Sequence, residues 1–334
     1  MRHEDLLRVQ AGAVTERTAP FAELRDARGD ELLAKANVVG VGIGHKLKDG
    51  EDTGTDCLSV LVRYKRPESD LDSADLVPKT MDSRPTDVLA VGEVFAHGLD
   101  RQPVTPSGNV DPHALSGRVR PLRPGFSVGH PGVTAGTIGA GCYDLEPMPG
   151  RPRAYYLLSN NHVIANSNDA TPGDPIVQPG PVDGGHAPQD VVGQLSRFIP
   201  IRFDGECNHV DAAVAQVPFH MIDRSIHWLG VPRSAAVPAE VGMLVRKTGR
   251  TTDFTTGRVT TIGATINVNF GNGRVAKFCE QIVTTDMSAG GDSGSLVLDL
   301  DNNPVGLLFA GSPTATILNP IATVQLALDV RLWP

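Results

Sequence analysis

Apolar and polar residues alternate in short runs along most of this chain, a pattern typical of β-strands that bury one face. The runs are dense after residue 125 and fall into two groups. The first group covers residues 133–138, 155–165, 174–177, 191–201 and 208–217, and the second covers 241–247, 256–261, 266–270, 279–284, 295–300 and 305–310. We expect each group to close into a β-barrel, because closure removes the exposed edges of a sheet.

The first third of the chain has a different pattern. Residues 19–36 have the apolar spacing of an amphipathic helix, interrupted near Gly29, and a helical turn is expected near 73–77. Alternating runs predict strands at 38–44, 58–64 and 87–94. Together they predict a small α+β subdomain over residues 1–98. Recurrent prolines predict an extended linker over 99–124, so that the mainly β domain spans 125–334.

Glycines at 40, 42 and 44 resemble part of a nucleotide-binding loop, but no helix is expected to begin after them. We therefore expect a strand that packs closely against a neighbour, and no cofactor.

The composition fits many short strands and turns. The 334 residues include 36 Gly and 26 Pro against 5% aromatic residues, and 40% are hydrophobic. A net charge of −8 gives no reason to expect nucleic acid or an anionic membrane as a partner. The charged start and the lack of a long apolar run predict a cytoplasmic location. The four cysteines at 57, 142, 207 and 279 have no CxxC spacing, so reduced thiols are expected.

A serine flanked by glycines is the strongest chemical signal. In the run Gly290–Ser295, with sequence GGDSGS, glycines allow a tight bend around Ser293. The N–H groups of Gly291 and Ser293 could then point together at a carbonyl oxygen and form an oxyanion hole. Gly, Asp and Ser are also ordinary turn residues, so this run alone does not separate a nucleophile from a surface turn.

Two further segments supply partners for this serine. An apolar run from Tyr155 ends in a small polar corner followed by His162, a candidate general base. Asp211 begins another apolar run, which suits a buried carboxylate that orients an imidazole. Asp183, Asp190 and Asp204 are weaker candidates for that role, and His209 is expected on the opposite face of its strand. The other histidines lack metal-site spacing, so no metal is expected.

In the order and local contexts of His162, Asp211 and Ser293, residues 125 to 334 resemble the chymotrypsin/trypsin-like serine peptidases. Shorter segments are similar to bacterial trypsin-like proteins and to plant narrow-leaf-type proteases: 158–162, 247–252, 257–259 and 306–311. The resemblance implies a chymotrypsin-like double β-barrel with the three residues in the cleft between the barrels. It also implies a serine endopeptidase that hydrolyses protein or peptide substrates through an acyl-enzyme.

The resemblance further implies a substrate pocket with Met287 at its base and Phe309, Ala310 and Gly311 in its walls. Relatives that cleave after Arg or Lys carry an aspartate at the base, which here is displaced to Asp286. An apolar or small side chain is therefore the expected preference.

Asp292 raises a question of activation. In secreted trypsin-like zymogens the equivalent residue receives an N-terminal ammonium released by cleavage, but no Ile-Val-Gly-Gly start follows a basic residue here. We expect activation without that ion pair, and an N-terminal subdomain that docks on or gates the cleft.

Two alternatives to a general endopeptidase remain at the level of sequence. One is a protease-fold binding or scaffold protein with weak or no activity. The other is a protease limited to one self-cleavage in the 99–124 linker. The sequence leaves open whether the chain forms a homo-oligomer.

Overall fold

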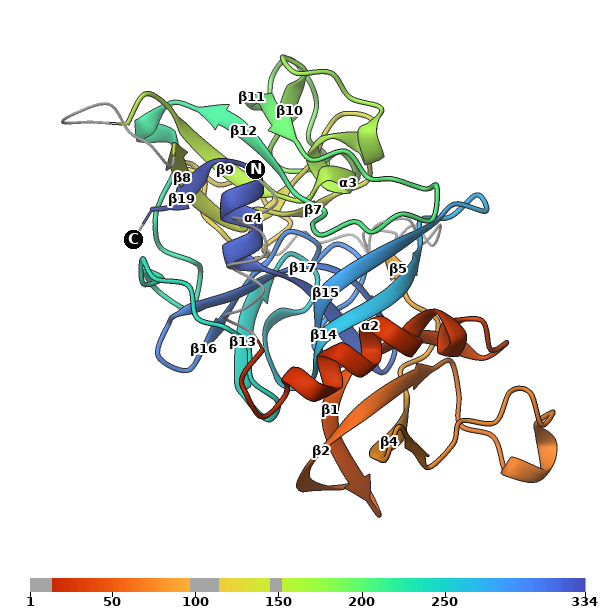
Figure 1. The fold of residues 1–334 in the computed structure, drawn as a ribbon. Coiled ribbons are helices and arrows are strands. Elements are labelled where there is room, and N and C mark those ends of the chain that lie inside the picture. The colour runs from red at the N-terminus through yellow and green to blue at the C-terminus, as the bar shows by residue number, and fades with distance from the viewer. Residues whose placement is uncertain (1–13, 97–113, 145–151, 334) are drawn as a thin grey trace.

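The computed structural model describes residues 14–96, 114–144 and 152–333 (Figure 1). Its strands form two main sheets; the N-terminal helix and the first strands, which extend the second sheet, lie at the bottom of this view. Most of the expected linker, residues 99–113, lies outside the described residues. Within the rest of it, Leu115 and Leu122 are buried, and Leu122 packs in the core of the first sheet.

The first sheet carries the histidine and aspartate segments. Its strands lie in the order β10-β11-β12-β9-β8-β19, and all described pairings are antiparallel. Their bounds are β8 Ala140–Asp144, β9 Tyr155–Ser159, β10 Pro175–Val177, β11 Val191–Phe198, β12 Ala213–Val217 and β19 Val330–Leu332. A short hairpin of β6 (Ser127–Val128) and β7 (Gly136–Thr137) attaches to β10 through a bridge between Gly129 and Val177.

The second sheet closes into a barrel. Its strands lie in the order β13-β16-β17-β18-β15-β14, and β13 pairs with β14 to complete the ring. Their bounds are β13 Leu244–Gly249, β14 Asp253–Asn269, β15 Val275–Thr285, β16 Leu296–Asp299, β17 Pro304–Ser312 and β18 Ala315–Pro320. Helix α4 (Ile321–Ala327) then returns the chain to the first sheet. We call this closed sheet the second barrel.

The N-terminal residues are part of the same sheet as the second barrel. Strand β1 (Val38–Lys48) pairs with β14 and with β2 (Glu51–Val62), and β4 (Arg84–Ala90) pairs in parallel with β2. The edge strand β3 is Thr80–Met81. A Cβ on Gly42 would lie 2.4 Å from Thr261 Cγ2, which explains the need for glycine where β1 approaches β14. The expected closely packed strand is therefore present.

Helix α2 (Ala19–Leu33) lies across this junction, red in Figure 1. Its buried Arg25 guanidinium lies 2.6 Å from Glu280 Oε1 of β15, and it also donates a hydrogen bond to the Gly263 carbonyl of β14. The helix thus fixes the N-terminal residues to the second barrel. Among the described residues, no helix is both long and apolar enough to cross a bilayer.

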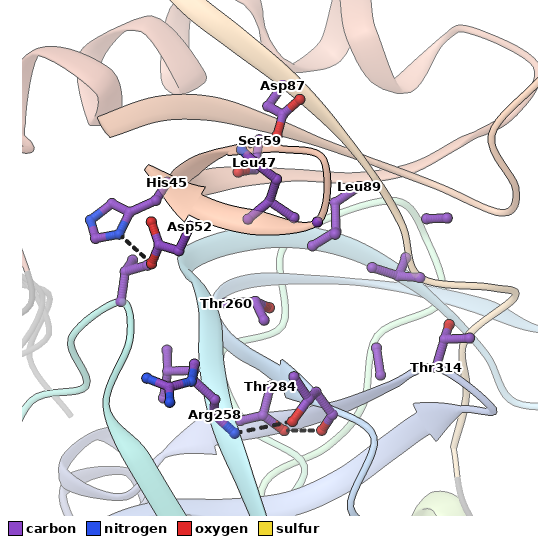
Figure 2. A pocket seen from close by; sticks show the side chains of 17 residues that line it. His45, Leu47, Asp52, Ser59, Asp87, Leu89, Arg258, Thr260, Thr284 and Thr314 are labelled. Atoms are coloured by element: carbon purple, nitrogen blue, oxygen red, sulfur yellow. Dashed lines mark hydrogen bonds and ion pairs between the residues drawn. The ribbon is translucent and has the colours of Figure 1, made fainter. Parts of the chain in front are cut away.

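A cavity of about 340 Å³ separates part of the N-terminal hairpin from the second barrel (Figure 2). His45 and Asp52 line one side of this cavity, with Nδ1 and Oδ2 3.0 Å apart, and Arg258 and Thr284 line the other. Residues 89–91 also line the cavity. Beyond the cavity the chain forms β5 (Phe95–Ala96), which pairs with β17 and β14 of the second barrel.

The mainly β fold with an N-terminal α+β part is as expected, and most strands lie where the alternating runs predicted them. The expected strands at 256–261 and 266–270 are one long, bulged strand, β14. The expected helix ends at Leu33 rather than at 36 and continues through Gly29. Residues 73–75 form a turn, and the nearby helical turn is a 3₁₀ turn at Glu68–Asp70. Strands β18 and β19 and helix α4 were not expected.

Candidate active site

His162 lies on a one-turn helix, α3 (Asn161–Ile164), that begins where β9 ends. The polar corner before it ties neighbouring segments together. Asn160 Nδ2 donates to the Asp211 carbonyl at 2.7 Å, and Asn161 Nδ2 donates to the Ile199 carbonyl at 2.7 Å. These buried side-chain amides take the place of the backbone hydrogen bonds that stop where the strand ends. They therefore fix the position of the backbone just before His162.

Asp211 lies beside His162 because β12 pairs with β9, with Ala213 opposite Ser159. Its Oδ2 is 2.5 Å from His162 Nδ1, and its Oδ1 accepts the His162 backbone N–H at 3.2 Å. The Asp211 N–H in turn donates to Asn319 Oδ1 at 3.0 Å. Both side chains are buried, so the carboxylate fixes the orientation of the imidazole and favours a proton on Nδ1.

Ser293 lies in a tight loop between β15 and β16 that requires glycine. Gly291 and Gly294 have φ values of +101° and +97°, and a Cβ on Gly294 would lie 2.2 Å from the Thr137 carbonyl oxygen. The Thr137 N–H donates to the Ser293 carbonyl at 2.7 Å. This contact holds the serine loop of the second barrel against β7 of the hairpin beside the first sheet.

The serine loop also meets the segment that carries His162. A Cβ on Gly136 would lie 2.5 Å from Val163 Cγ2 and 2.9 Å from the Ser293 carbonyl oxygen. Ser293 is thus brought close to the residue that follows His162. Its Oγ lies 3.2 Å from the Phe309 carbonyl oxygen of β17, to which it donates.

The backbone of the serine loop has a defined pattern of donors. The N–H groups of Asp292, Gly294 and Ser295 donate to the carbonyls of Ala289, Leu308 and Asp292, respectively. These three groups are directed into the protein. The two expected oxyanion donors, on Gly291 and Ser293, are not among these bonds, and their role stays a prediction.

Asp292 is held by a buried network built around Lys247. Its Oδ2 lies 3.1 Å from Lys247 Nζ and accepts from Thr252 Oγ1 at 2.6 Å and from the Ala289 N–H at 3.0 Å. Its Oδ1 accepts the Thr251 N–H at 2.8 Å. Burial lowers the pKa of Lys247 from its usual value, and the Asp292 charge opposes that shift. The positive charge that balances Asp292 is therefore the side chain of Lys247.

The residues expected to form the substrate pocket are largely buried. Met287 packs in the core of the second barrel, where its Sδ would lie 2.7 Å from a Cβ on Gly257. The Phe309 side chain packs against Phe278, with ring centroids 4.7 Å apart. Asp286 is exposed, and its Oδ1 accepts the Ser288 N–H. Whether Met287, Phe309, Ala310 and Gly311 contact a substrate side chain stays a prediction.

The weaker candidates for the orienting carboxylate have other partners. Asp183 pairs with Arg250, Asp204 pairs with Arg202, and Asp190 lies 3.4 Å from Arg118. His209 precedes Asp211, and its carbonyl accepts a hydrogen bond from Gln281 Nε2 at 3.0 Å. Among the residues that the structure describes, no three His, Cys, Asp or Glu side chains gather as metal ligands.

The expectation that the cysteines are reduced is wrong for two of them. Cys207 and Cys279 form a disulfide, whereas Cys57 and Cys142 are buried free thiols. The disulfide is favoured because the chain near Asn208 runs beside β15, so that the two Cα atoms lie 5.6 Å apart. Sequence spacing could not show this, because 72 residues separate the two cysteines.

Sequence reasoning also missed Asn160, Asn319 and Lys247 as supports of the site. The small polar corner before His162 was visible as a motif, but its amides were not assigned partners. Lys247 lies in the run KTGRTT, whose resemblance to bacterial trypsin-like proteins gives no sign of a buried ion pair.

Comparison with known proteins gives a partial sequence match. The chain is 34% identical to glutamyl endopeptidase 2 of Streptomyces griseus over 106 residues, which is 30% of this chain and 53% of the relative. The chain thus matches about half the length of this curated relative. No family model matches the sequence.

Solved structures of serine proteases also resemble the chain. Thermobifida fusca protease A is 14% identical, with a TM-score of 0.45, and the likeness covers 63% of this chain and 97% of that one. A glutamic acid-specific serine protease is 21% identical, with a TM-score of 0.44, over 64% and 100% of the two chains. Cellulomonas bogoriensis chymotrypsin is 15% identical, with a TM-score of 0.42, over 64% and 98%.

The partial match and these solved structures are serine proteases, and the mainly β body preceded by an N-terminal helix is as expected from the sequence.

Proposed function

We propose that this protein is a serine endopeptidase with His162, Asp211 and Ser293 as its catalytic triad. The observation that carries the proposal is the buried 2.5 Å contact between His162 Nδ1 and Asp211 Oδ2 beside the glycine-bounded loop of Ser293. Burying a carboxylate against an imidazole costs free energy, because two polar groups must leave water, and such costly arrangements are common at functional sites. The same arrangement is what a hydroxyl nucleophile needs for activation.

In the proposed mechanism, Ser293 Oγ attacks a peptide carbonyl carbon while His162 Nε2 takes the hydroxyl proton. The carbonyl oxygen becomes an oxyanion, which the N–H groups of Gly291 and Ser293 stabilise. His162 then gives its proton to the leaving amine, and an acyl-enzyme remains. Water attacks this ester with His162 again as the base, which releases the carboxylic acid and restores Ser293.

Asp211 has a positioning and electrostatic role in this scheme. It keeps the imidazole in one tautomer and stabilises the imidazolium that forms in each transition state. Asn319 and Asn160 hold the Asp211 backbone on both sides of its side chain, at 3.0 and 2.7 Å. The carboxylate is therefore ready before substrate arrives.

We propose a small or apolar side chain at the residue before the cleaved bond. Met287 at the expected pocket base carries no charge, and Asp286 is turned to the Ser288 N–H. The glutamyl specificity named for the matched relative is the main competing outcome. A peptide library with a varied residue at this position tests the proposal, and a Glu, Arg or Lys preference would contradict it.

The location of the protein is a separate proposal. The sequence favoured the cytoplasm, but a disulfide is more typical of an oxidising compartment. Fractionation of cells with an antibody against the chain would decide between the two.

Labelling with a fluorophosphonate probe tests the proposed activity. We expect the probe to label the wild-type protein and not Ser293→Ala, and a fluorogenic peptide to be cleaved only by the wild type. Ser288→Ala is a matched control, because it removes a hydroxyl in the same loop that lies 2.7 Å from Thr316 Oγ1. Absence of labelling and cleavage under all conditions would support a scaffold protein instead.

A further inference from the structure

Strand β17 runs directly past the candidate nucleophile. Ser293 Oγ donates to the Phe309 carbonyl of this strand, and Ala310 and Gly311 follow Phe309 along it. A peptidase must hold the backbone of an extended peptide next to its serine. An exposed strand edge does so with main-chain hydrogen bonds, whatever the sequence of the peptide.

That stretch of β17 already has a partner from the N-terminal part of the chain. Strand β5 pairs with it antiparallel, with Ala96 opposite Ala310 and Phe95 opposite Gly311. Because the pairing is antiparallel, the carboxyl end of β5 is the end nearer to Phe309 and Ser293. The segment therefore approaches the serine in the direction required of the acyl side of a substrate, whose carbonyl comes last.

The segment is also held from its other side. Asn269 at the end of β14 pairs with Phe95, and its N–H donates to the Val94 carbonyl at 2.9 Å. On the β17 side, Ser312 Oγ donates a hydrogen bond to the Val91 carbonyl. Residues 91–96 thus lie between β17 and the tip of β14, with main-chain bonds on both flanks.

Burial shows that this contact is a packed one. Val94 and Ala96 are each 1% exposed and share a hydrophobic cluster with Phe270, Phe309 and Ala310. Phe270 also lies edge-on to the His162 ring, with centroids 6.2 Å apart. The side chains of Val94 and Ala96 therefore pack in the same cluster as Phe309 and Ala310 of the expected substrate pocket.

We propose that residues Val94–Ala96 are an internal peptide that occupies the substrate-binding edge of β17, and that the structure is the self-inhibited form of the protein. The proposal rests on the proposed peptidase function. The surface at Ala310–Gly311 takes an extended peptide backbone, and its resident occupant is this segment of the chain itself. A substrate must displace β5 before it reaches Ser293.

The rate of fluorophosphonate labelling of the full chain tests this inference. Ala96→Asp places a charge at a buried position and should release β5, whereas Leu300→Asp adds the same charge at an exposed turn. If the edge is free in about 1–10% of wild-type molecules, release should raise the labelling rate by about 10- to 100-fold. The Leu300→Asp protein should label at the wild-type rate.

The outcomes separate the inference from the proposed function. Equal labelling of folded Ala96→Asp and wild type, with both cleaving peptides, would overturn the inference and leave the peptidase in place. No labelling of any of the proteins would overturn the proposed function, and the inference with it. Near-UV circular dichroism checks that each variant is folded.

A second measurement needs no variant. Hydrogen exchange of the wild-type amides at residues 94–96 is followed with and without a tripeptidyl boronate, which binds the serine and offers its own backbone to β17. We expect the boronate to raise exchange in this segment, because the two peptides compete for one edge. Unchanged protection of residues 94–96 in the boronate complex would overturn the inference.

Discussion

Lys247 Nζ lies 3.1 Å from Asp292 Oδ2, and both side chains are 0% exposed. Asp292 directly precedes the candidate nucleophile, so this ion pair fixes the shape of the serine loop. In secreted zymogens the balancing ammonium is a newly cut N-terminus, and the sequence had left its replacement open. An internal lysine supports the expectation that no such cut is needed to order this loop.

Replacing Lys247 by methionine should strongly destabilise the protein. The change keeps most of the side-chain volume but leaves Asp292 buried and unpaired, which costs about 3–5 kcal/mol. Chemical denaturation measures this loss. Lys277→Met is the matched control, because Lys277 also lies 3.1 Å from an aspartate, Asp30, whose side chain is 89% exposed. A similar loss in both variants would show that the buried pair has no special role.

Activity should fall on the alkaline side as Lys247 loses its proton. Burial lowers its pKa, so it titrates below the usual lysine value of about 10.5; the neutral amine, unlike methionine, can still donate a hydrogen bond to Asp292, but it no longer carries a charge. In this window the unfolded chain binds more protons than the folded chain, so the titration alone does not reduce stability as pH rises. A pH profile of kcat/KM together with thermal melts tests this. Parallel losses of activity and stability would contradict it.

Asp211→Asn should reduce kcat by about four orders of magnitude while the protein stays folded. An amide at this position can favour the wrong imidazole tautomer and cannot stabilise an imidazolium. Steady-state kinetics on a fluorogenic peptide measure the effect. Asp204→Asn is the control, since its carboxylate lies at the surface with Arg202. A loss of less than tenfold in Asp211→Asn would remove Asp211 from the mechanism.

Gly291→Ala should lower kcat by about 10²- to 10³-fold, the usual cost of one lost oxyanion donor. The new Cβ would lie 2.4 Å from Thr251 Oγ1, so the peptide group must move. Gly173→Ala separates this effect from backbone strain, because Gly173 has the same φ of +101° and no atom within 4 Å of its Cβ position. Equal kinetics for the two variants would argue against an oxyanion role for Gly291.

Reducing agents should lower the melting temperature of the wild type but not of a Cys207→Ala/Cys279→Ala double variant. A disulfide that closes a loop of this length stabilises a protein by about 2–5 kcal/mol.

Cys57 and Cys142 should resist alkylation in the native protein, because burial raises the pKa of Cys57 to about 11 and also raises that of Cys142. Rapid native alkylation of four thiols would show that the bridge is absent.

The positions of the candidate triad could be predicted because each residue lies in a local pattern that the chain itself displays. His162 ends an apolar strand, Asp211 begins one, and Ser293 is set between glycines. The role of Lys247 could not be predicted in this way, since its burial depends on β13 packing beside the serine loop. Alternation along β13 gives no sign that a charged residue faces inward.

The strand β5 was hidden for a different reason. It has two residues, too few for any periodicity, and the expected strand over 87–94 instead ends at Ala90. Its pairing depends on contacts with β17 and β14, which lie far away in sequence. The expectation that the N-terminal residues dock on or gate the cleft therefore named no segment, and the segment proposed for that role could be chosen only from the structure.

The pairing of β1 with β14 has a consequence for any shortened form of the protein. Gly40 and Ile43 of β1 lie opposite Ile266 and Ile262 of β14, so removal of the N-terminal residues would leave this edge of β14 without a partner strand. Such an edge is a template for intermolecular pairing. A fragment that begins at residue 125 should therefore aggregate rather than behave as a minimal peptidase. In the full protein, the N-terminal strands and the second barrel should unfold in a single thermal transition.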